Sequence, residues 1–158
     1  MAYIINEFTG DDYSNIFAGL PEVNSDGERE LIDFCNRHKE NVLAAMPWVA
    51  SEIADACGFE SLFCLIRHYG GRKIYLPRLT DKFQEKYAIA ILPKHYDRLC
   101  KSAGATGNID IPSAWGVFVS IRRAAMQTAL QKQVPPTLLV QTFGVTMRSI
   151  RNLKSKRE

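Results

Sequence analysis

Two stretches of the sequence, LIRHYGGRKIYLPR at residues 65–78 and LCKSAGATGNIDIPS at residues 99–113, decide the expected fold. Each reads as the end of a helix, then a glycine break, then a short strand in which apolar residues alternate with other residues until a proline. Proline ends such a strand because it has no N–H to donate to the ladder. We therefore interpret the chain as containing a helix–glycine–strand unit twice.

The two strands are expected to pair with each other. Cross-strand apolar pairs are the usual stabilising unit of a two-stranded ribbon. We hypothesise an antiparallel ribbon formed within one chain, in which Ile74 and Leu76 pair with Ile109 and Ile111. The alternatives are two unrelated strands whose prolines coincide, or a ribbon formed between two copies of the chain.

Apolar residues with helical spacing surround these strands. A helix is expected from Glu28 to about Met46, where Pro47 ends it. Ser113 is expected to cap a longer helix that runs to about Gln131. On that longer helix we expect Phe118, Ile121, Ala125 and Ala129 to point inward and Arg122 and Gln127 to point outward.

The expected fold class is mostly α, with two short β-strands that form an antiparallel ribbon in a helical core or dimerisation domain. A C-terminal helix-turn-helix follows this domain. The first domain is expected over residues 1–112, with strands near 72–77 and 108–112. The second domain, residues 113–158, comprises a linker helix and the helix-turn-helix.

The charges of the 158-residue chain are unevenly distributed, although its net charge is only +3. Residues 1–60 carry −9, residues 61–112 carry +5 and residues 113–158 carry +7. A basic end favours a polyanionic partner, and the acidic head lies outside both basic segments. The alternative is a charged face that is merely solvated.

No targeting or membrane-spanning segment is expected. The N-terminus turns acidic at once, and no run approaches the ~18 apolar residues that a membrane helix needs. None of the four cysteines belongs to a C-x-x-C pair. We expect a cytoplasmic protein with reduced cysteines and no membrane partner.

Residues 136–155 fit a helix-turn-helix, in which two short helices cross around a tight turn. Gly144 is expected to form that turn, because glycine enters left-handed backbone geometry freely. Apolar side chains fall where the two helices must meet, at Leu139, Phe143, Val145, Ile150 and Leu153.

The second of these helices presents residue types that can read a DNA major groove. Arginine pairs with guanine, asparagine pairs with adenine, and threonine or methionine methyl groups pack on thymine. The alternative is a solvated basic helix that packs on the core and binds nothing. We expect contacts to bases from Thr146, Met147, Arg148, Ser149, Arg151 and Asn152, and contacts to phosphates from Lys154, Lys156 and Arg157.

The first stretch resembles a motif of the Mor transcription activator family of Mu-like phages and prophages. That family shows a helix, a Gly-Gly break, a strand reading roughly [IV]-Y-[IL]-P-[RK], and a C-terminal helix-turn-helix. The resemblance covers about residues 50–158, and FGVTMRSI at residues 143–150 looks like the turn and recognition helix of the family. The matching residues of the first motif are Gly70, Gly71, Ile74, Tyr75, Leu76, Pro77 and Arg78.

The resemblance implies a homodimeric activator that binds an imperfect DNA dyad and recruits bacterial RNA polymerase. In that family the strands form the dimerisation ribbon, and the acidic head of this chain would serve as the polymerase contact. The resemblance also places the Gly-Gly strand near the DNA backbone between half-sites. The residues concerned are Gly70, Gly71 and Tyr75, and we also expect Arg72 and Lys73 beside them to bind DNA.

The chain departs from the family pattern in its spacing. Pro77 lies 66 residues before Phe143, which is too far for the single long helix expected between strand and helix-turn-helix. Pro112 lies only 31 residues before Phe143, which suits one helix and a turn. A second helix–glycine–strand unit accounts for the extra length and makes an internal pseudo-dimer the alternative to a homodimer.

Other chemistry finds little support in the sequence. Cys64 and His68 share a helix face and Cys57 lies one loop earlier, but zinc sites usually show ligands paired at short spacing. No phosphate-binding glycine loop and no supported nucleophile–base pair is present. We expect no metal, no cofactor and no enzymatic activity.

The sequence therefore predicts a sequence-specific, double-stranded-DNA-binding transcription regulator, most simply an activator that recruits bacterial RNA polymerase. The alternative is a protein-interaction module of phage or prophage origin. In that reading the acidic N-terminal region is the working surface and the helix-turn-helix is vestigial.

Overall fold

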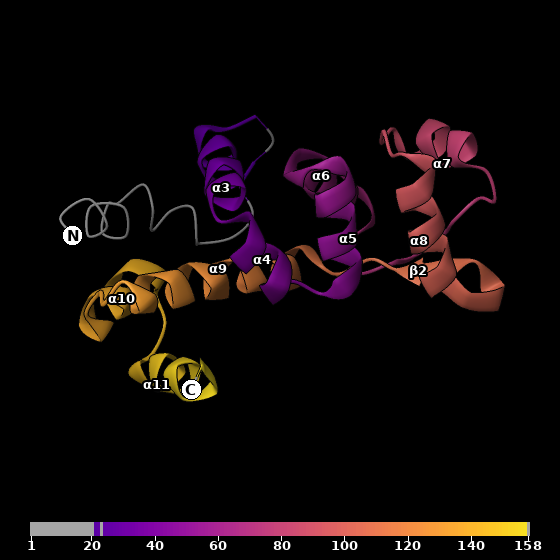
Figure 1. The fold of residues 1–158 in the computed structure, drawn as a ribbon. Coiled ribbons are helices and arrows are strands. Elements are labelled where there is room, and N and C mark those ends of the chain that lie inside the picture. Colours follow the sequence, from indigo (N-terminus) through magenta and orange to yellow (C-terminus); the bar gives the residue numbers. More distant parts are fainter. Residues whose placement is uncertain (1–20, 23, 158) are drawn as a thin grey trace. The chain divides into compact units, whose positions relative to one another are not determined.

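The computed structural model describes residues 21, 22 and 24–157, with side chains as far as Lys154. The described chain is mostly helical and contains one two-stranded sheet (Figure 1). Its backbone forms two compact units. The central unit contains residues 46–117, and the terminal unit contains the described residues before 46 together with residues 118–157.

These two units group the chain differently from the predicted boundary after residue 112. The helices before residue 46 belong to the same unit as those after residue 117. The reason is packing along the helix that follows Ser113. There Asn41 Nδ2 donates a hydrogen bond to Thr128 Oγ1 at 3.3 Å. The division of roles between residues 1–112 and 113–158 stays a prediction.

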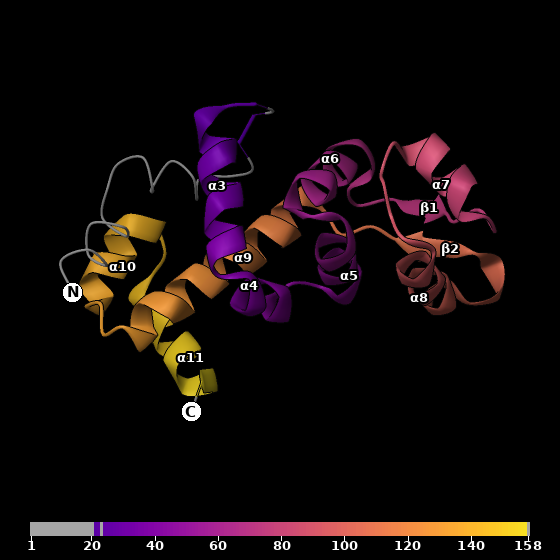
Figure 2. The same cartoon turned by 45° about the horizontal axis from the view of Figure 1, so that its top comes forward.

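The central unit begins with a tightly joined helix pair, α5 (Trp48–Cys57) and α6 (Phe59–Tyr69), which lie side by side (Figures 1 and 2). Gly58 caps the end of α5, because its N–H donates to Ala54 O at 2.8 Å. After the first strand come α7 (Thr80–Tyr87), α8 (Pro93–Ala103) and the 3₁₀ turn η1 (Gly104–Thr106).

The ribbon of the central unit is formed within the chain, as hypothesised. Strand β1 (Lys73–Tyr75) pairs antiparallel with β2 (Asn108–Asp110), and Ile74 stands opposite Ile109 (Figure 2). Leu76 and Ile111 do not face each other. The N–H of Leu76 donates to Gly107 O at 2.8 Å, and the N–H of Ile111 donates to Arg72 O at 2.9 Å.

One face of the ribbon is buried and the other is exposed. Ile74, Leu76, Ile109 and Ile111 are all buried, whereas Lys73, Tyr75 and Asp110 are exposed. This is the alternation expected of a strand with one face on a core. Tyrosines from the two following helices also hold the first strand. The hydroxyl of Tyr87 donates to Tyr75 O at 2.9 Å, and the hydroxyl of Tyr96 donates to Pro77 O.

In the terminal unit, the single helix predicted from Glu28 to Met46 is wrong. The chain forms α3 (Asp26–Arg37) and α4 (Lys39–Ala45) instead, and the backbone of His38 leaves the helical region at φ −119° and ψ 38°. The His38 ring packs against Phe34, with 4.7 Å between ring centroids. The break leaves the apolar residues of both helices buried, from Leu31 to Val42.

The long helix α9 (Ala114–Gln131) follows the prediction in its bounds and its inward face. Ser113 caps it, because its hydroxyl accepts the N–H of Gly116 at 3.0 Å. The predicted inward residues are fully buried: Phe118, Ile121, Ala125 and Ala129.

The two residues predicted to point outward on α9 are corrections, because Arg122 and Gln127 are both half-buried. Arg122 is half-buried, and its guanidinium lies 5.9 Å from the ring centroid of Phe118. The long apolar stem of arginine explains this position, since it covers core side chains while the charged end reaches outward. Among the described residues, no helix combines the length and apolarity needed to cross a membrane.

Candidate nucleic-acid interface

The last two helices, α10 (Pro136–Phe143) and α11 (Met147–Arg157), are joined by a three-residue turn. Pro136 occupies the first turn of α10, where a missing N–H breaks no hydrogen bond. Gly144 adopts φ 62° and ψ 36°, and its N–H donates to Val140 O at 3.0 Å. The predicted turn at Gly144 is therefore confirmed.

The predicted apolar contact between these helices is largely confirmed. Leu139, Phe143, Ile150 and Leu153 are buried, and Val145 in the turn is half-buried. Helix α11 therefore packs through one narrow stripe, the positions 150 and 153. The other described side chains of α11 are not part of this apolar stripe.

Thr146 caps the start of α11. Its hydroxyl accepts the N–H of Ser149 at 3.1 Å, which satisfies one of the free amides of the first turn. The hydroxyls of Thr146 and Ser149 also lie 3.1 Å apart, so each is partly engaged by the other.

The structure brings most of the predicted reading residues together on the exposed side of α11. The side chains of Lys156 and Arg157 lie outside the described residues. The exposed residues are Thr146, Met147, Arg148, Ser149, Arg151, Asn152 and Lys154.

This surface is electropositive. The sequence contains no Asp or Glu between Ile111 and Arg157. Within the part of the chain that the structure describes, no ion pair engages Arg148, Arg151 or Lys154. Cationic groups without carboxylate neighbours favour a polyanion.

A cavity of about 210 Å³ lies between α9 and α11, and the sequence did not predict it. It is lined by Arg122, Arg123 and Met126 of α9 and by Val145, Ser149 and Asn152 of α11 and its turn, among others. Burial, and then the charge of Arg123, lowers the pKa of Arg122. The sequence feature that indicated this site is the pair of adjacent arginines, Arg122 and Arg123, in the segment 113–158 that carries a net charge of +7.

The Gly-Gly strand residues belong to the central unit, where packing explains Gly70 and a φ of 75° explains Gly71. A Cβ on Gly70 would lie 2.5 Å from Ile66 O and 3.3 Å from Ala114 N. The N–H of Gly71 donates to Ile111 O at 2.9 Å. Arg72, Lys73 and Tyr75 are exposed. These residues and those of α11 belong to different units.

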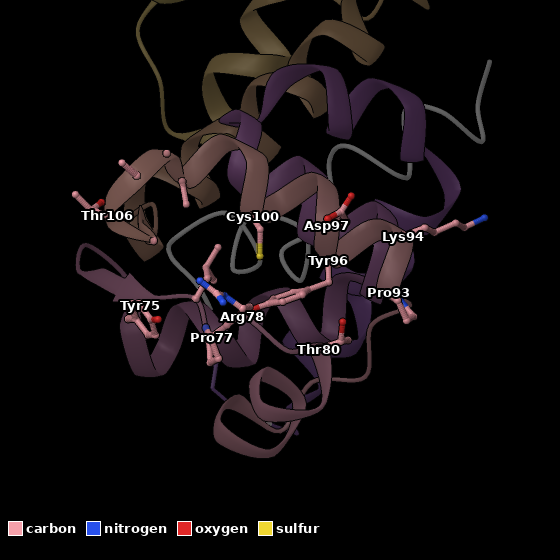
Figure 3. Close-up of a pocket in the computed structure, with 15 residues that line it drawn as sticks. Tyr75, Pro77, Arg78, Thr80, Pro93, Lys94, Tyr96, Asp97, Cys100 and Thr106 are labelled. Atoms are coloured by element: carbon pink, nitrogen blue, oxygen red, sulfur yellow. The ribbon is translucent and has the colours of Figure 1, made fainter.

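A larger groove, of about 730 Å³, lies in the central unit where β1 ends beside α8 (Figure 3). Figure 3 shows Arg78, Tyr96 and Cys100 pointing toward one another in its middle. Burial raises the pKa of Tyr96, whose hydroxyl donates to Pro77 O. The carboxylate of Asp97 on the rim pairs with Lys101 Nζ at 3.5 Å.

The structure offers no grouped metal ligands in the described residues. Cys64 Sγ and His68 Nδ1 lie 4.0 Å apart on α6, and His68 Nδ1 lies 2.8 Å from Cys64 O. No set of three His, Cys, Asp or Glu side chains there could hold an ion. The helical spacing of Cys64 and His68 is enough to explain their approach.

The resemblance to the Mor family depends on residues 65–78 and 143–150 alone. The chain matches no protein-family model, no curated protein and no solved structure.

Proposed function

We propose that this chain is a sequence-specific, double-stranded-DNA-binding transcription regulator, with α10 and α11 as a helix-turn-helix and α11 as the recognition helix. The observation that carries the proposal is the composition of the exposed side of α11. Arg148, Arg151 and Lys154 are exposed and unpaired among the described residues, while Ile150 and Leu153 fix the helix to the core. Arginine reads guanine in the major groove by two hydrogen bonds.

The experiment is selection of bound sites from a pool of random duplexes, using the full chain. Enrichment of one sequence supports the proposal, and its symmetry gives the number of helices that act together. A recovered dyad means two recognition helices at one site. A pool without enrichment would overturn sequence-specific recognition by α11 and with it the proposal.

A substitution then tests the recognition helix itself. Arg148→Ala should weaken the selected duplex by about 1–3 kcal/mol and relax the preference at one base position. Lys154→Ala should weaken all duplexes by a similar factor, because a phosphate contact carries no sequence information. If Arg148 reads the base that contributes most to specificity, the Arg148→Ala variant should bind the selected and scrambled duplexes with equal affinity.

The proposal includes activation through bacterial RNA polymerase. The acidic residues Asp26, Glu28, Glu30 and Asp33 of α3 are the basis for a protein partner of that helix. Two of them form ion pairs within the helix, Asp26 with Arg29 and Asp33 with Arg37. Transcription in vitro from a template bearing the selected site measures the direction of regulation. A transcript increase supports an activator, and a decrease makes the chain a repressor.

The alternative function, a protein-interaction module, makes a different prediction for the same measurements. Binding to duplex DNA would then be absent at low salt. The acidic α3 would carry the activity, and substitutions on α11 would change nothing.

A further inference from the structure

We infer that the cavity between α9 and α11 is a binding site for one phosphate of the DNA backbone, held by Arg123 with Arg122, Ser149 and Asn152. This inference builds on the proposed function, because it adds a contact from the linker helix to a duplex read by α11. It also changes the role predicted for Ser149 and Asn152, from reading bases to holding the backbone.

The geometry of the cavity supports a small anion. Its volume of about 210 Å³ is too small for a nucleotide-sized ligand, which needs about 300 Å³ or more, and is open enough for a tetrahedral phosphate. The polar residues of its lining are Arg122 and Arg123 of α9 and Ser149 and Asn152 of α11, and the apolar ones are Val119, Met126, Val145 and Leu153. Guanidinium, hydroxyl and amide N–H groups are the donors that hold DNA phosphates.

The charges of the residues that line the cavity also favour an anion. None of its lining residues is acidic. Arg123 is exposed and has no ion pair among the described residues. Two neighbouring guanidinium groups repel each other, which is the cause of part of the lowered pKa of Arg122. An anion between them removes that repulsion.

The start of α11 borders the same site. Val145 precedes the helix and Ser149 lies in its first turn, and both line the cavity. The N–H of Ser149 is already bound by Thr146 Oγ1 at 3.1 Å, so the positive charge of the site comes from the two arginines.

The exposed residues of α11 fall into two groups, those that line the cavity and those that do not. Ser149 and Asn152 are three residues apart, so they lie on one row, and both line the cavity. Arg148 and Arg151 form the neighbouring row and do not line it. Base reading is thereby assigned to Arg148 and Arg151, and backbone contact to Ser149 and Asn152.

The test measures how the affinity for duplex DNA depends on salt, with wild-type chain and Arg123→Gln. Each neutralised phosphate contributes about 0.9 to the slope of log affinity against log salt. Arg123→Gln should therefore make the slope less steep by about one for specific and non-specific duplexes alike. Arg123 is exposed, so the variant should keep the wild-type thermal unfolding midpoint.

Two controls separate the site from a general loss of charge. Arg123→Lys keeps the charge and should keep most of the slope. Lys132→Gln removes an exposed charge just after α9, outside the cavity, and should leave the slope unchanged. An equal change in slope for Lys132→Gln and Arg123→Gln would overturn the inference.

A third variant tests the reassigned residue. Asn152→Ala should weaken selected and scrambled duplexes by the same factor, whereas a change in the preferred base sequence would overturn the backbone role of Asn152.

The outcomes for the site and for the proposed function are distinct. Wild-type binding with an unchanged slope in Arg123→Gln overturns the phosphate site and leaves the regulator in place. Non-specific binding whose slope falls in Arg123→Gln supports the phosphate site and removes sequence-specific regulation. A wild-type chain that binds no duplex at low salt overturns both.

Discussion

The two helix–glycine–strand segments, residues 65–78 and 99–113, share a sequence pattern but are held in different ways. Gly70 in the first segment has φ −56°, which any residue can adopt, yet there is no room for a side chain beside Ile66 and Ala114. Gly104 in the second segment has open space around it, but its φ of 72° is one that residues with a side chain rarely adopt. The same residue type is therefore required for packing in one segment and for backbone geometry in the other.

The segments differ again after the glycine break. In the first segment the carbonyl groups of Tyr75 and Pro77 accept hydrogen bonds from Tyr87 and Tyr96. The second segment inserts the turn η1 before its strand, where Asn108 N–H donates to Thr106 Oγ1 at 3.3 Å. The first strand is held by later helices, and the second is held by its own turn. The repeated sequence pattern therefore forms two paired strands that are held in place by different parts of the chain.

The largest expected effect tests what the segments share. Ile74→Ala and Ile109→Ala should each lower the free energy of unfolding by about 3 kcal/mol, because both side chains are 6% exposed and face each other. Urea unfolding measures both. The double variant should lose less than the sum of the two, since residues in contact are not additive.

A small effect of Ile109→Ala beside a large one of Ile74→Ala would contradict the equivalence of the two strands. The second strand would then contribute less to the free energy of unfolding than the first.

The next effect tests where the segments differ. Gly70→Ala should lower the free energy of unfolding by about 2–3 kcal/mol, because its Cβ would lie 2.5 Å from a backbone oxygen that has little freedom to move. Gly104→Ala, the matched control, adds a methyl group to open space, and backbone strain alone should cost about 1 kcal/mol. Chemical unfolding of the two variants in parallel gives the difference. The distinction fails if Gly104→Ala is the more damaging.

The local features of this chain could be predicted from the sequence because each is decided by a few neighbouring residues. The cap at Ser113 and the turn at Gly144 form as expected. The antiparallel pairing of the two strands follows from alternation and from the closing prolines. The register does not follow, because pairing all four apolar residues would require Ile74 opposite Ile111 and Leu76 opposite Ile109, whereas Ile74 faces Ile109 and Leu76 faces Gly107.

The features that depend on distant packing were not predictable. The break at His38 has no proline or glycine to announce it, and it accompanies a ring contact with Phe34. The partial burial of Arg122 depends on the neighbours that α9 acquires in the fold, and helical periodicity alone placed it outward. The cavity beside Arg122 is formed by α9 and α11, which are separated in sequence, so the sequence indicated it only through the pair Arg122 and Arg123.

A smaller effect concerns the tyrosine supports of the first strand. Tyr87→Phe removes one hydrogen bond, to Tyr75 O, and keeps the aromatic packing with Phe83, so it should lower the free energy of unfolding by about 1 kcal/mol. Thr106→Val is the counterpart in the second segment, where it removes the hydroxyl that accepts from Asn108 N–H. Thr106 is exposed and water can replace that bond, so thermal unfolding should show a smaller loss. A larger loss for Thr106→Val would reverse the order of the two supports.

The smallest effect is a dependence on pH that comes from Tyr96, the tyrosine that holds the end of the first segment. Burial raises the pKa of Tyr96 above its usual value of about 10, so the folded chain favours the neutral phenol that donates to Pro77 O. The stability from this group is complete below about pH 10 and is lost as the pH rises toward the folded pKa. At pH 10 the loss relative to neutral pH is about 0.4 kcal/mol, because half of the unfolded phenols are ionised. Tyr96→Phe should remove this component, so the unfolding free energies of wild type and variant should converge between pH 8 and pH 10. Parallel curves over that range would mean that Tyr96 ionises as readily in the folded chain as in the unfolded one, and that the first strand has no special sensitivity to alkali.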